Sequence, residues 1–260
     1  MAMTGLSLSE LFVRAGRFFY FLGMKQIWML GLALCLMACS TGKKEVPADW
    51  PRKAREAMGF PANMNSLEVY AMADCSGPNS SFQTLLISNR SNTRFEQLGA
   101  NYHNLSVHRP DSAWRFDFNA NTLEGMDNAY RAFLFSHELH MVAIWPEARF
   151  GLPQALEQSE YGGKAAVRLE FIDAMDSPFF IYYDAQTHLP LGFTVNNHIG
   201  LGEGDVSIYF KSWQNQDGKQ LFQAATFVQG DDEFRYDFTE LDFNREVMGD
   251  FFAVRPLISR

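Results

Sequence analysis

The chain has 260 residues, of which 47% are hydrophobic, 15% are aromatic and 20% are charged. This length and composition fit a globular protein with a substantial core, and they exclude a wholly disordered, collagen-like or coiled-coil chain. The 22 basic and 30 acidic residues give a net charge of −8. Since the sequence is acidic and lacks a basic run, we expect no nucleic-acid partner.

Residues 24–38 have the pattern of a secretory signal segment. Lys25 supplies a positive charge, and the apolar run that follows is shorter than the roughly 20 residues that cross a bilayer. The tetrapeptide Leu36-Met37-Ala38-Cys39 then resembles the lipobox of bacterial lipoproteins. The resemblance implies a signal peptide over 24–38, lipidation of Cys39 and an acylated new N-terminus. The alternative is a plain signal peptide or an uncleaved membrane anchor.

The residue after the lipobox bears on the destination of the protein. In enterobacterial lipoproteins an Asp at this position marks retention in the inner membrane, whereas this chain has Ser40. The resemblance therefore implies sorting to the outer membrane, with the domain facing the periplasm. Residues 1–23 are interpreted either as an over-long N-terminal extension upstream of Met24 or as an extension of the apolar region.

The mature chain is predicted to consist of a lipidated Cys and a short tether over 39–48, followed by a single domain over 49–260. Cys75 is then the one thiol left beside the lipidated Cys39, so no disulfide is expected. A lone Cys in such a chain is predicted to be a small packed hydrophobe.

The first predicted elements of the domain are a helix and a series of strands. The helix covers 49–58, with Asp49 as its cap, Pro51 in its first turn and Gly59 as its stop. A second helix is predicted over 128–145, because apolar residues recur there at spacings of three and four before Pro146. Between the helices, an alternation of period two predicts strands over 67–73, 82–88, 94–99, 103–108 and 113–119.

The C-terminal third carries the clearest strand pattern, with hairpin following hairpin and no room for crossover helices. We therefore predict a mainly β (α+β) fold, in which a strongly curved antiparallel sheet forms a half-open barrel and two or three helices cover its concave face. The expected turns lie at 184–190 and 216–219. The expected strands cover 167–171, 179–183, 191–197, 206–210, 221–229 and 233–243.

Two of these strands carry a one-sided apolar stripe that has to be buried. A curled sheet with a helix at its mouth either packs solid or leaves an apolar cleft, and clefts at barrel mouths are frequent ligand sites. We predict that the stripe lines such a cleft and binds an apolar or acyl-chain ligand, the alternative being ordinary core. The predicted lining residues are Val206, Ile208, Phe210, Phe234, Tyr236 and Phe238.

The turn and strand-end motifs resemble those of a known superfamily. They are Tyr183-Asp184 followed by Thr187 and Leu189-Pro190, a strand ending at Trp213, the Asp217-Gly218 turn, Asn244 and the segment from Asp250 to Phe252. Upstream lie Trp114 and the sequence His137-Glu138-Leu139-His140 before Pro146 and Arg149. This set is similar to the LolA/LolB-like lipoprotein-carrier superfamily of Gram-negative bacteria. The resemblance implies an open barrel of about eleven strands with helices as a lid, which holds acyl chains in an apolar cavity without a cofactor.

The sharpest candidate for catalysis is the sequence His137-Glu138-Leu139-His140. On one helix the two imidazoles would share a face, which gives the alternative of a metal-dependent hydrolase using His137 and His140. The spacing is one residue shorter than that of zincins, and no third ligand is evident. We therefore predict a solvated or hydrogen-bonded histidine pair, with no catalytic residue, no metal and no cofactor.

Taken together, these patterns predict a non-enzymatic lipoprotein of the outer membrane, anchored through Cys39, that binds an apolar or acyl-chain ligand. A second hypothesis is a scaffold lipoprotein whose core is filled and whose surface binds an envelope protein. The metal-dependent hydrolase is the third.

Overall fold

The computed structural model describes residues 46–199, 204–245 and 250–258, and these belong to one compact unit. The predicted N-terminal extension, the signal peptide and Cys39 lie outside the described residues. Within those residues, no helix has the length and apolar character needed to cross a membrane.

The described chain contains two successive series of antiparallel strands. The first series is β1 (Glu68–Gly77), β2 (Ser80–Asn89), β3 (Thr93–Gly99), β4 (His103–His108), β5 (Ala113–Asp117) and β6 (Thr122–Gly125). The second series is β7 (Ala155–Tyr161), β8 (Lys164–Ile172), β9 (Pro178–Asp184), β10 (Pro190–Val195), β11 (Val206–Gln216), β12 (Lys219–Gln229) and β13 (Asp232–Phe243). Every predicted strand is present. The sequence does not predict β6 and β7, because most of their residues are exposed and lack an apolar alternation.

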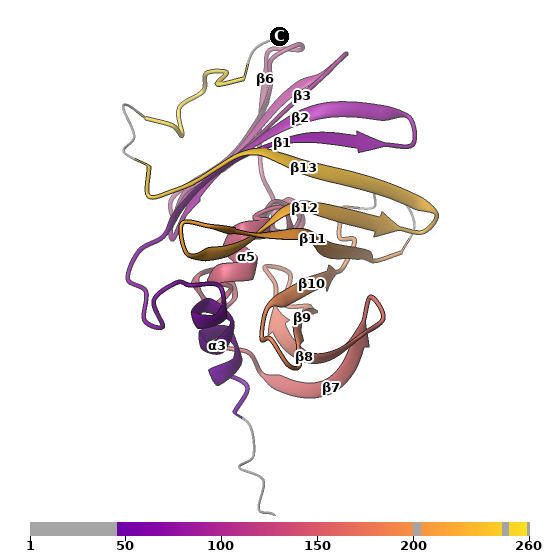
Figure 1. The fold of residues 1–260 in the computed structure, drawn as a ribbon. Coiled ribbons are helices and arrows are strands. Elements are labelled where there is room, and N and C mark those ends of the chain that lie inside the picture. Colours follow the sequence, from indigo (N-terminus) through magenta and orange to yellow (C-terminus); the bar gives the residue numbers. More distant parts are fainter. Residues whose placement is uncertain (1–45, 200–203, 246–249, 259–260) are drawn as a thin grey trace, which may run out of the picture. The chain divides into compact units, whose positions relative to one another are not determined.

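The two series join into one sheet because β1 pairs with β13. In the described residues this sheet has thirteen strands, in the order β6-β5-β4-β3-β2-β1-β13-β12-β11-β10-β9-β8-β7. It curls strongly but does not close, so β6 and β7 are its edges (Figure 1). The predicted fold class, a strongly curved antiparallel sheet in the form of a half-open barrel, is confirmed.

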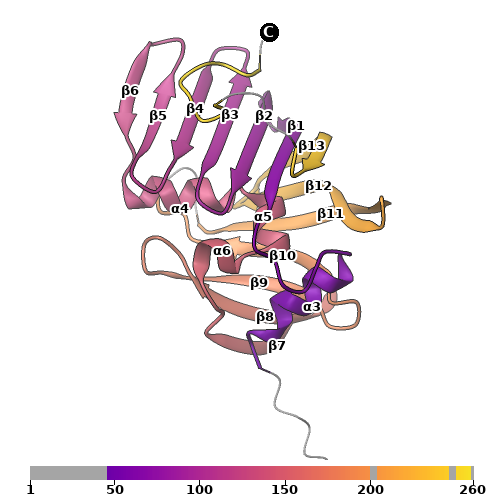
Figure 2. The same cartoon turned by 90° about the vertical axis from the view of Figure 1, so that its left-hand side faces the viewer.

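The helices number four in the part of the chain that the structure describes. They are α3 (Asp49–Ala57), α4 (Asn128–Ser136), α5 (Leu139–Ile144) and α6 (Glu147–Phe150). The helix α3 matches the prediction, although Ala48 rather than Asp49 occupies the N-cap position. The segment from α4 to α6 connects the two series of strands and lies between them on the concave side of the sheet (Figure 2).

The predicted helix over 128–145 is interrupted at Glu138, which separates α4 from α5. Glu138 has a non-helical backbone, and its fully buried carboxylate pairs with Arg149 at 2.7 Å between Oε2 and Nε. Thr93 on β3 donates a hydrogen bond to the same carboxylate. The helix therefore breaks where Glu138 turns toward the β2–β3 turn, where Arg149 also donates to the carbonyl oxygen of Asn89.

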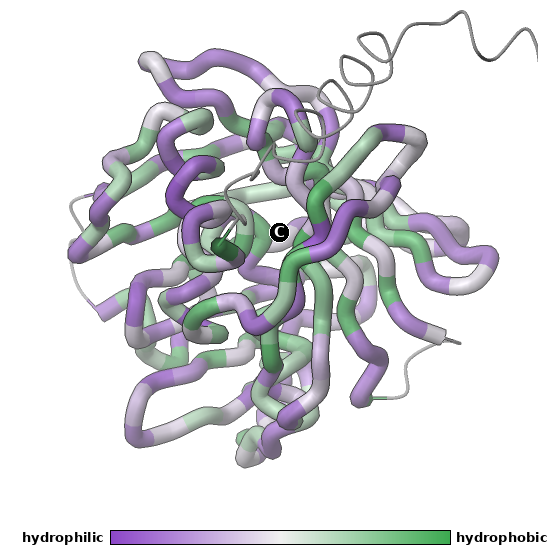
Figure 3. The backbone as a smooth tube through the Cα atoms, turned by 90° about the horizontal axis from the view of Figure 1, so that it is seen from below, coloured by the Kyte–Doolittle hydropathy of each residue, from purple (hydrophilic) through white to green (hydrophobic). Residues whose placement is uncertain are grey.

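The main core fills the concave side of the sheet around α5. All six residues of α5 are buried, and the inward side chains of β8–β12, such as Phe171, Phe193 and Ile208, are fully buried in the same core. Viewed from below, hydrophilic residues gather at the strand turns and hydrophobic ones along the strands (Figure 3). Most of the predicted concave cavity is thus occupied by the protein's own side chains.

A second, smaller core covers the outer face of β1–β3. Leu85, Ile87 and Leu98 point outward there, and the C-terminal segment 250–258 packs over them through Ile258. The strands β1–β3 are therefore buried on both faces.

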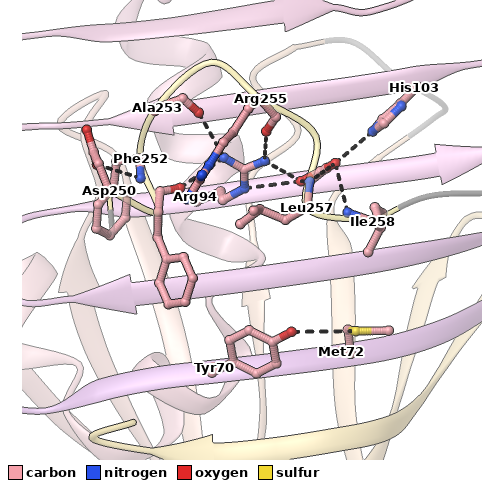
Figure 4. Close-up of polar contacts among 12 residues, drawn as sticks. Tyr70, Met72, Arg94, His103, Asp250, Phe252, Ala253, Arg255, Leu257 and Ile258 are labelled. Carbon is pink, nitrogen blue, oxygen red and sulfur yellow. Dashed lines mark hydrogen bonds and ion pairs between the residues drawn. The ribbon is translucent and has the colours of Figure 1, made fainter. Parts of the chain in front are cut away.

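Two buried charges hold this C-terminal segment by its backbone. Arg94 and Glu96 are both fully buried on the outer face of β3. Arg94 donates hydrogen bonds to the carbonyl oxygen of Phe251, at 2.9 Å, and to the carbonyl oxygens of two further residues of the segment (Figure 4). Glu96 accepts hydrogen bonds from the backbone amides of Leu257, at 3.1 Å, and of Ile258, at 3.3 Å. Alternating charges on a strand are typical of a solvated face, so the sequence does not predict this burial.

Candidate functional site

A cleft of about 270 Å³ opens between α4 and the adjoining ends of strands β10–β13. Its volume is close to the lower end of the range for ligand pockets, roughly 300–1,000 Å³. The apolar wall is formed by Phe82, Phe133, Val195, Ile199, Val206, Phe227, Phe234 and Tyr236. The polar side chains that line it are Ser136, His137, Asn196, Asn197, His198, Gln229 and Asp232.

Aromatic rings from three elements form the wall nearest to β12. Phe227 on β12 lies directly opposite Phe234 on β13, and its ring centroid is 4.6 Å from that of Tyr236. The His137 ring, at the end of α4, stacks on Phe227 at 5.3 Å. Gly77 on β1 leaves space for Phe234, since a Cβ atom there would lie 2.3 Å from the ring. The wall is therefore apolar and closely packed.

The mouth of the cleft is held by polar contacts between loops. Nε2 of His198 lies 2.6 Å from Oδ2 of Asp173, and Oδ1 of Asp173 accepts a hydrogen bond from the amide of Ser177. The side-chain amide of Asn196 donates to the carbonyl oxygen of Pro178 at 2.8 Å. These bonds fasten the segment that leaves β10 to the β8–β9 turn, so this side of the mouth has a defined shape.

The six residues predicted to line a ligand cavity divide into two groups. Val206, Phe234 and Tyr236 line the cleft. Ile208 and Phe210 lie deeper on β11 and are buried in the core. Phe238 belongs to this second group, because it packs against the core and its ring centroid lies 4.5 Å from that of His140.

Sequence reasoning did not identify the lining residues of the other elements, such as Phe82, Phe133, Val195 and Phe227. One signal was available for Phe227: it belongs to the predicted strand that forms a hairpin with the strand carrying Phe234. The residues of α4 and β2 gave no such signal, because only the folded sheet brings them to the cleft.

The interior beyond the cleft is almost filled. A separate small cavity of about 10 Å³ shares Ser136 and Val195 with the cleft and is also lined by Val142, Phe150 and Phe179. The Phe150 and Phe179 rings are in contact there, with centroids 4.5 Å apart. In this conformation the described interior therefore leaves little space beyond the cleft.

The two histidines considered as metal ligands are separated by the break at Glu138. Nδ1 of His137 lies 2.9 Å from the carbonyl oxygen of Phe133. Nε2 of His140 lies 3.2 Å from the carbonyl oxygen of Phe222. The ring of Phe222 stacks on that of His140, with centroids 4.0 Å apart. Burial lowers the pKa of His137 to about 4 and that of His140 to about 3. Across the described residues, no group of three His, Cys, Asp or Glu side chains could hold a metal ion.

Cys75, the one cysteine among the described residues, is buried in the main core. Burial raises its pKa to about 12. The thiol is therefore protonated and unreactive at neutral pH. This agrees with the prediction of a small packed hydrophobe.

Comparison with known proteins identifies the type of fold. No family model matches the sequence, and no curated protein matches it significantly. Among solved structures, a LolA-superfamily protein from Nitrosomonas europaea is similar, with a TM-score of 0.52 and 13% identity over 80% of this chain and 98% of that one. At this identity the likeness shows the fold alone, and the chain therefore has a LolA-like open-barrel fold.

Two other solved structures have lower scores. A DUF1329 family protein from Desulfovibrio piger has a TM-score of 0.49 and 10% identity, over 81% of this chain and 98% of that one. A domain provisionally named as an outer membrane lipoprotein-sorting protein, from Vibrio parahaemolyticus, has a TM-score of 0.48 and 10% identity, over 76% and 93%.

Proposed function

We propose that this protein is an outer-membrane lipoprotein, anchored through Cys39 and facing the periplasm, whose cleft binds an apolar or acyl chain without transforming it. The observation that carries the proposal is the aromatic cleft at the open end of a LolA-like barrel. The lipobox-like tetrapeptide ending at Cys39 supports the anchor.

The chemistry of the cleft favours binding over catalysis. Ser136 donates its hydroxyl to the carbonyl oxygen of Phe133 at 2.6 Å. Its neighbour His137 stays neutral at physiological pH, because burial lowers its pKa to about 4. The wall offers apolar surface instead, and each methylene group of a ligand buried there contributes about 0.8 kcal/mol. A chain end of several methylenes is thus expected to bind with micromolar to millimolar affinity.

Blocking the cleft is expected to weaken binding strongly. Val206 lines the cleft, so Val206→Trp places an indole in the space that a chain would occupy. Titration of the purified domain with the uncharged fluorescent probe phenylnaphthylamine should show saturable binding by the wild type. The variant should bind at least about tenfold more weakly, a loss that corresponds to two methylene contacts.

The matched control is Val228→Trp on the adjacent strand. Val228 is next to the cleft residue Phe227, and it therefore points to the opposite face of the sheet. This variant should bind the probe like the wild type. Equal binding by the Val206→Trp protein, or no saturable binding by the wild type, would contradict the proposed function.

Lipidation is tested separately on the full chain expressed in a Gram-negative host. Mass spectrometry of the N-terminal peptide is expected to show cleavage before Cys39 and the added mass of acyl groups. The Cys39→Ala variant should carry no lipid and should not be cleaved before residue 39. An unmodified Cys39 in the mature protein, or a mature N-terminus at another residue, would contradict the anchor.

The filled interior favours a second candidate, an envelope scaffold that holds no ligand. Phe210 and Phe222 stack at 4.1 Å in the middle of the concave face, where a lipid carrier would need space. The probe titration separates the two candidates, because a scaffold of this kind would take up no probe.

A further inference from the structure

We propose that the cleft selects amphiphiles whose polar head is uncharged or cationic, and that it discriminates against anionic heads such as those of free fatty acids. The inference rests on the proposed function, in which an apolar chain enters the cleft. It concerns the polar head of the ligand, which stays at the mouth of the cleft because the interior beyond the cleft is filled.

Acidic side chains surround the mouth of the cleft. Asp232 lines the cleft itself, and Asp173 lies directly behind the rim residue His198, to which it is bonded. Asp205 is exposed one residue before Val206. A head group at the mouth therefore meets the carboxylate of Asp232, with two further acidic side chains close to the rim.

No Lys or Arg belongs to the described residues that line the cleft. Arg235 alternates with Phe234 and Tyr236 along β13, so it points to the outer face, and it pairs there with Asp237 at 2.7 Å. Lys211 lies over the ring of Tyr209, which belongs to the outer aromatic cluster of the sheet. The basic groups nearest in sequence to the cleft strands are thus directed away from it.

The neutral donors at the mouth are partly engaged as well. The side-chain amide of Asn196 donates to the carbonyl oxygen of Pro178. That of Gln229 donates to the carbonyl oxygen of Gly204 at 3.1 Å. An anionic head would therefore gain few hydrogen bonds to offset its repulsion by the carboxylates, whereas a cationic or neutral head meets no such repulsion.

Competition against the uncharged probe tests this selectivity with three amphiphiles that share one alkyl chain. Dodecyltrimethylammonium, dodecyl maltoside and dodecanoate are each titrated below their critical micelle concentrations, at pH 8 and low salt. We expect the cation and the neutral head to displace the probe at about tenfold lower concentration than dodecanoate, given the strength of charge interactions near a protein surface. The difference should shrink at high salt, because exposed charges are screened.

A matched pair of variants assigns the effect to the mouth. Asp232→Asn should strengthen dodecanoate binding several-fold, whereas Asp217→Asn, in the β11–β12 turn at the other end of these strands, should not change it. Dodecanoate binding as tight as that of the cation, or unchanged dodecanoate binding in Asp232→Asn, would overturn the inference alone. If neither the probe nor any of the three amphiphiles binds, the proposed function fails and this inference fails with it.

Discussion

Replacing Glu96 by Ala is expected to lower the free energy of unfolding by about 3–5 kcal/mol, because the change leaves a buried guanidinium without its counter-ion. Arg94 and Glu96 have no solvent-exposed surface, and Nε of Arg94 lies 3.1 Å from Oε2 of Glu96. Burial lowers the pKa of Arg94, and the carboxylate of Glu96 acts in the opposite direction. Without that carboxylate, only backbone carbonyl oxygens remain to offset the cost of burying the cation.

The same substitution is expected to release the C-terminal segment. Glu96 accepts the amides of Leu257 and Ile258, and these bonds hold the segment over Leu85 and Ile87. Urea denaturation measures the loss of stability, and limited proteolysis within 250–258 reports the release. The loss of stability and the release of the segment should appear together, because the same residues of the segment bond to the charge pair and cover Leu85 and Ile87.

Two variants serve as controls for this prediction. Glu240→Ala removes an exposed carboxylate of β13, which pairs with Arg245 after the end of that strand. This loss should lower the free energy of unfolding by no more than about 1 kcal/mol. The double variant Arg94→Met with Glu96→Leu removes both charges, and an apolar pair of similar volume is often neutral or stabilising. If Glu96→Ala costs no more than Glu240→Ala, the buried pair does not hold the segment.

Local sequence patterns were sufficient to predict two of the turns and every described strand except β6 and β7. Asp184 illustrates why: its carboxylate accepts the backbone amides of Gln186 and Thr187, both at 2.9 Å, which is the contact that makes Asp typical of turns. The Asp217-Gly218 turn follows the same logic, since both residues have positive φ, 52° and 80°. These features depend on neighbours in sequence.

The position of the cleft could not be predicted, because it depends on contacts between distant residues. The chain from α4 to α6 lies where it does because Glu138 pairs with Arg149 and bonds to Thr93, which precedes it by 45 residues. That break places α5 inside the sheet and fills the deeper half of the predicted stripe, around Ile208 and Phe210. No local pattern distinguishes these two residues from Val206, which lies at the open end.

Acidification is expected to destabilise the fold through His140, which is 1% exposed and neutral in the native state. Burial lowers its pKa in the folded protein to about 3, whereas an unfolded histidine has a pKa of about 6.5. Below pH 6.5 the unfolded chain binds a proton that the native protein does not bind. The stability contributed by neutral His140 is thus complete above pH 6.5 and falls by about 1.4 kcal/mol per pH unit as the pH decreases towards 3.

Urea denaturation at a series of pH values between 7 and 4.5 measures this slope. His140→Phe keeps an aromatic ring against Phe222 but removes the titrating group, so its slope should be smaller than that of the wild type by the equivalent of one proton. Phe222→Leu disturbs the same stack at 4.0 Å and leaves the titration in place, so it should lower stability equally at every pH. A wild-type slope in His140→Phe would show that the acid sensitivity comes from other groups, such as His108, whose pKa is also lowered by burial, to about 4.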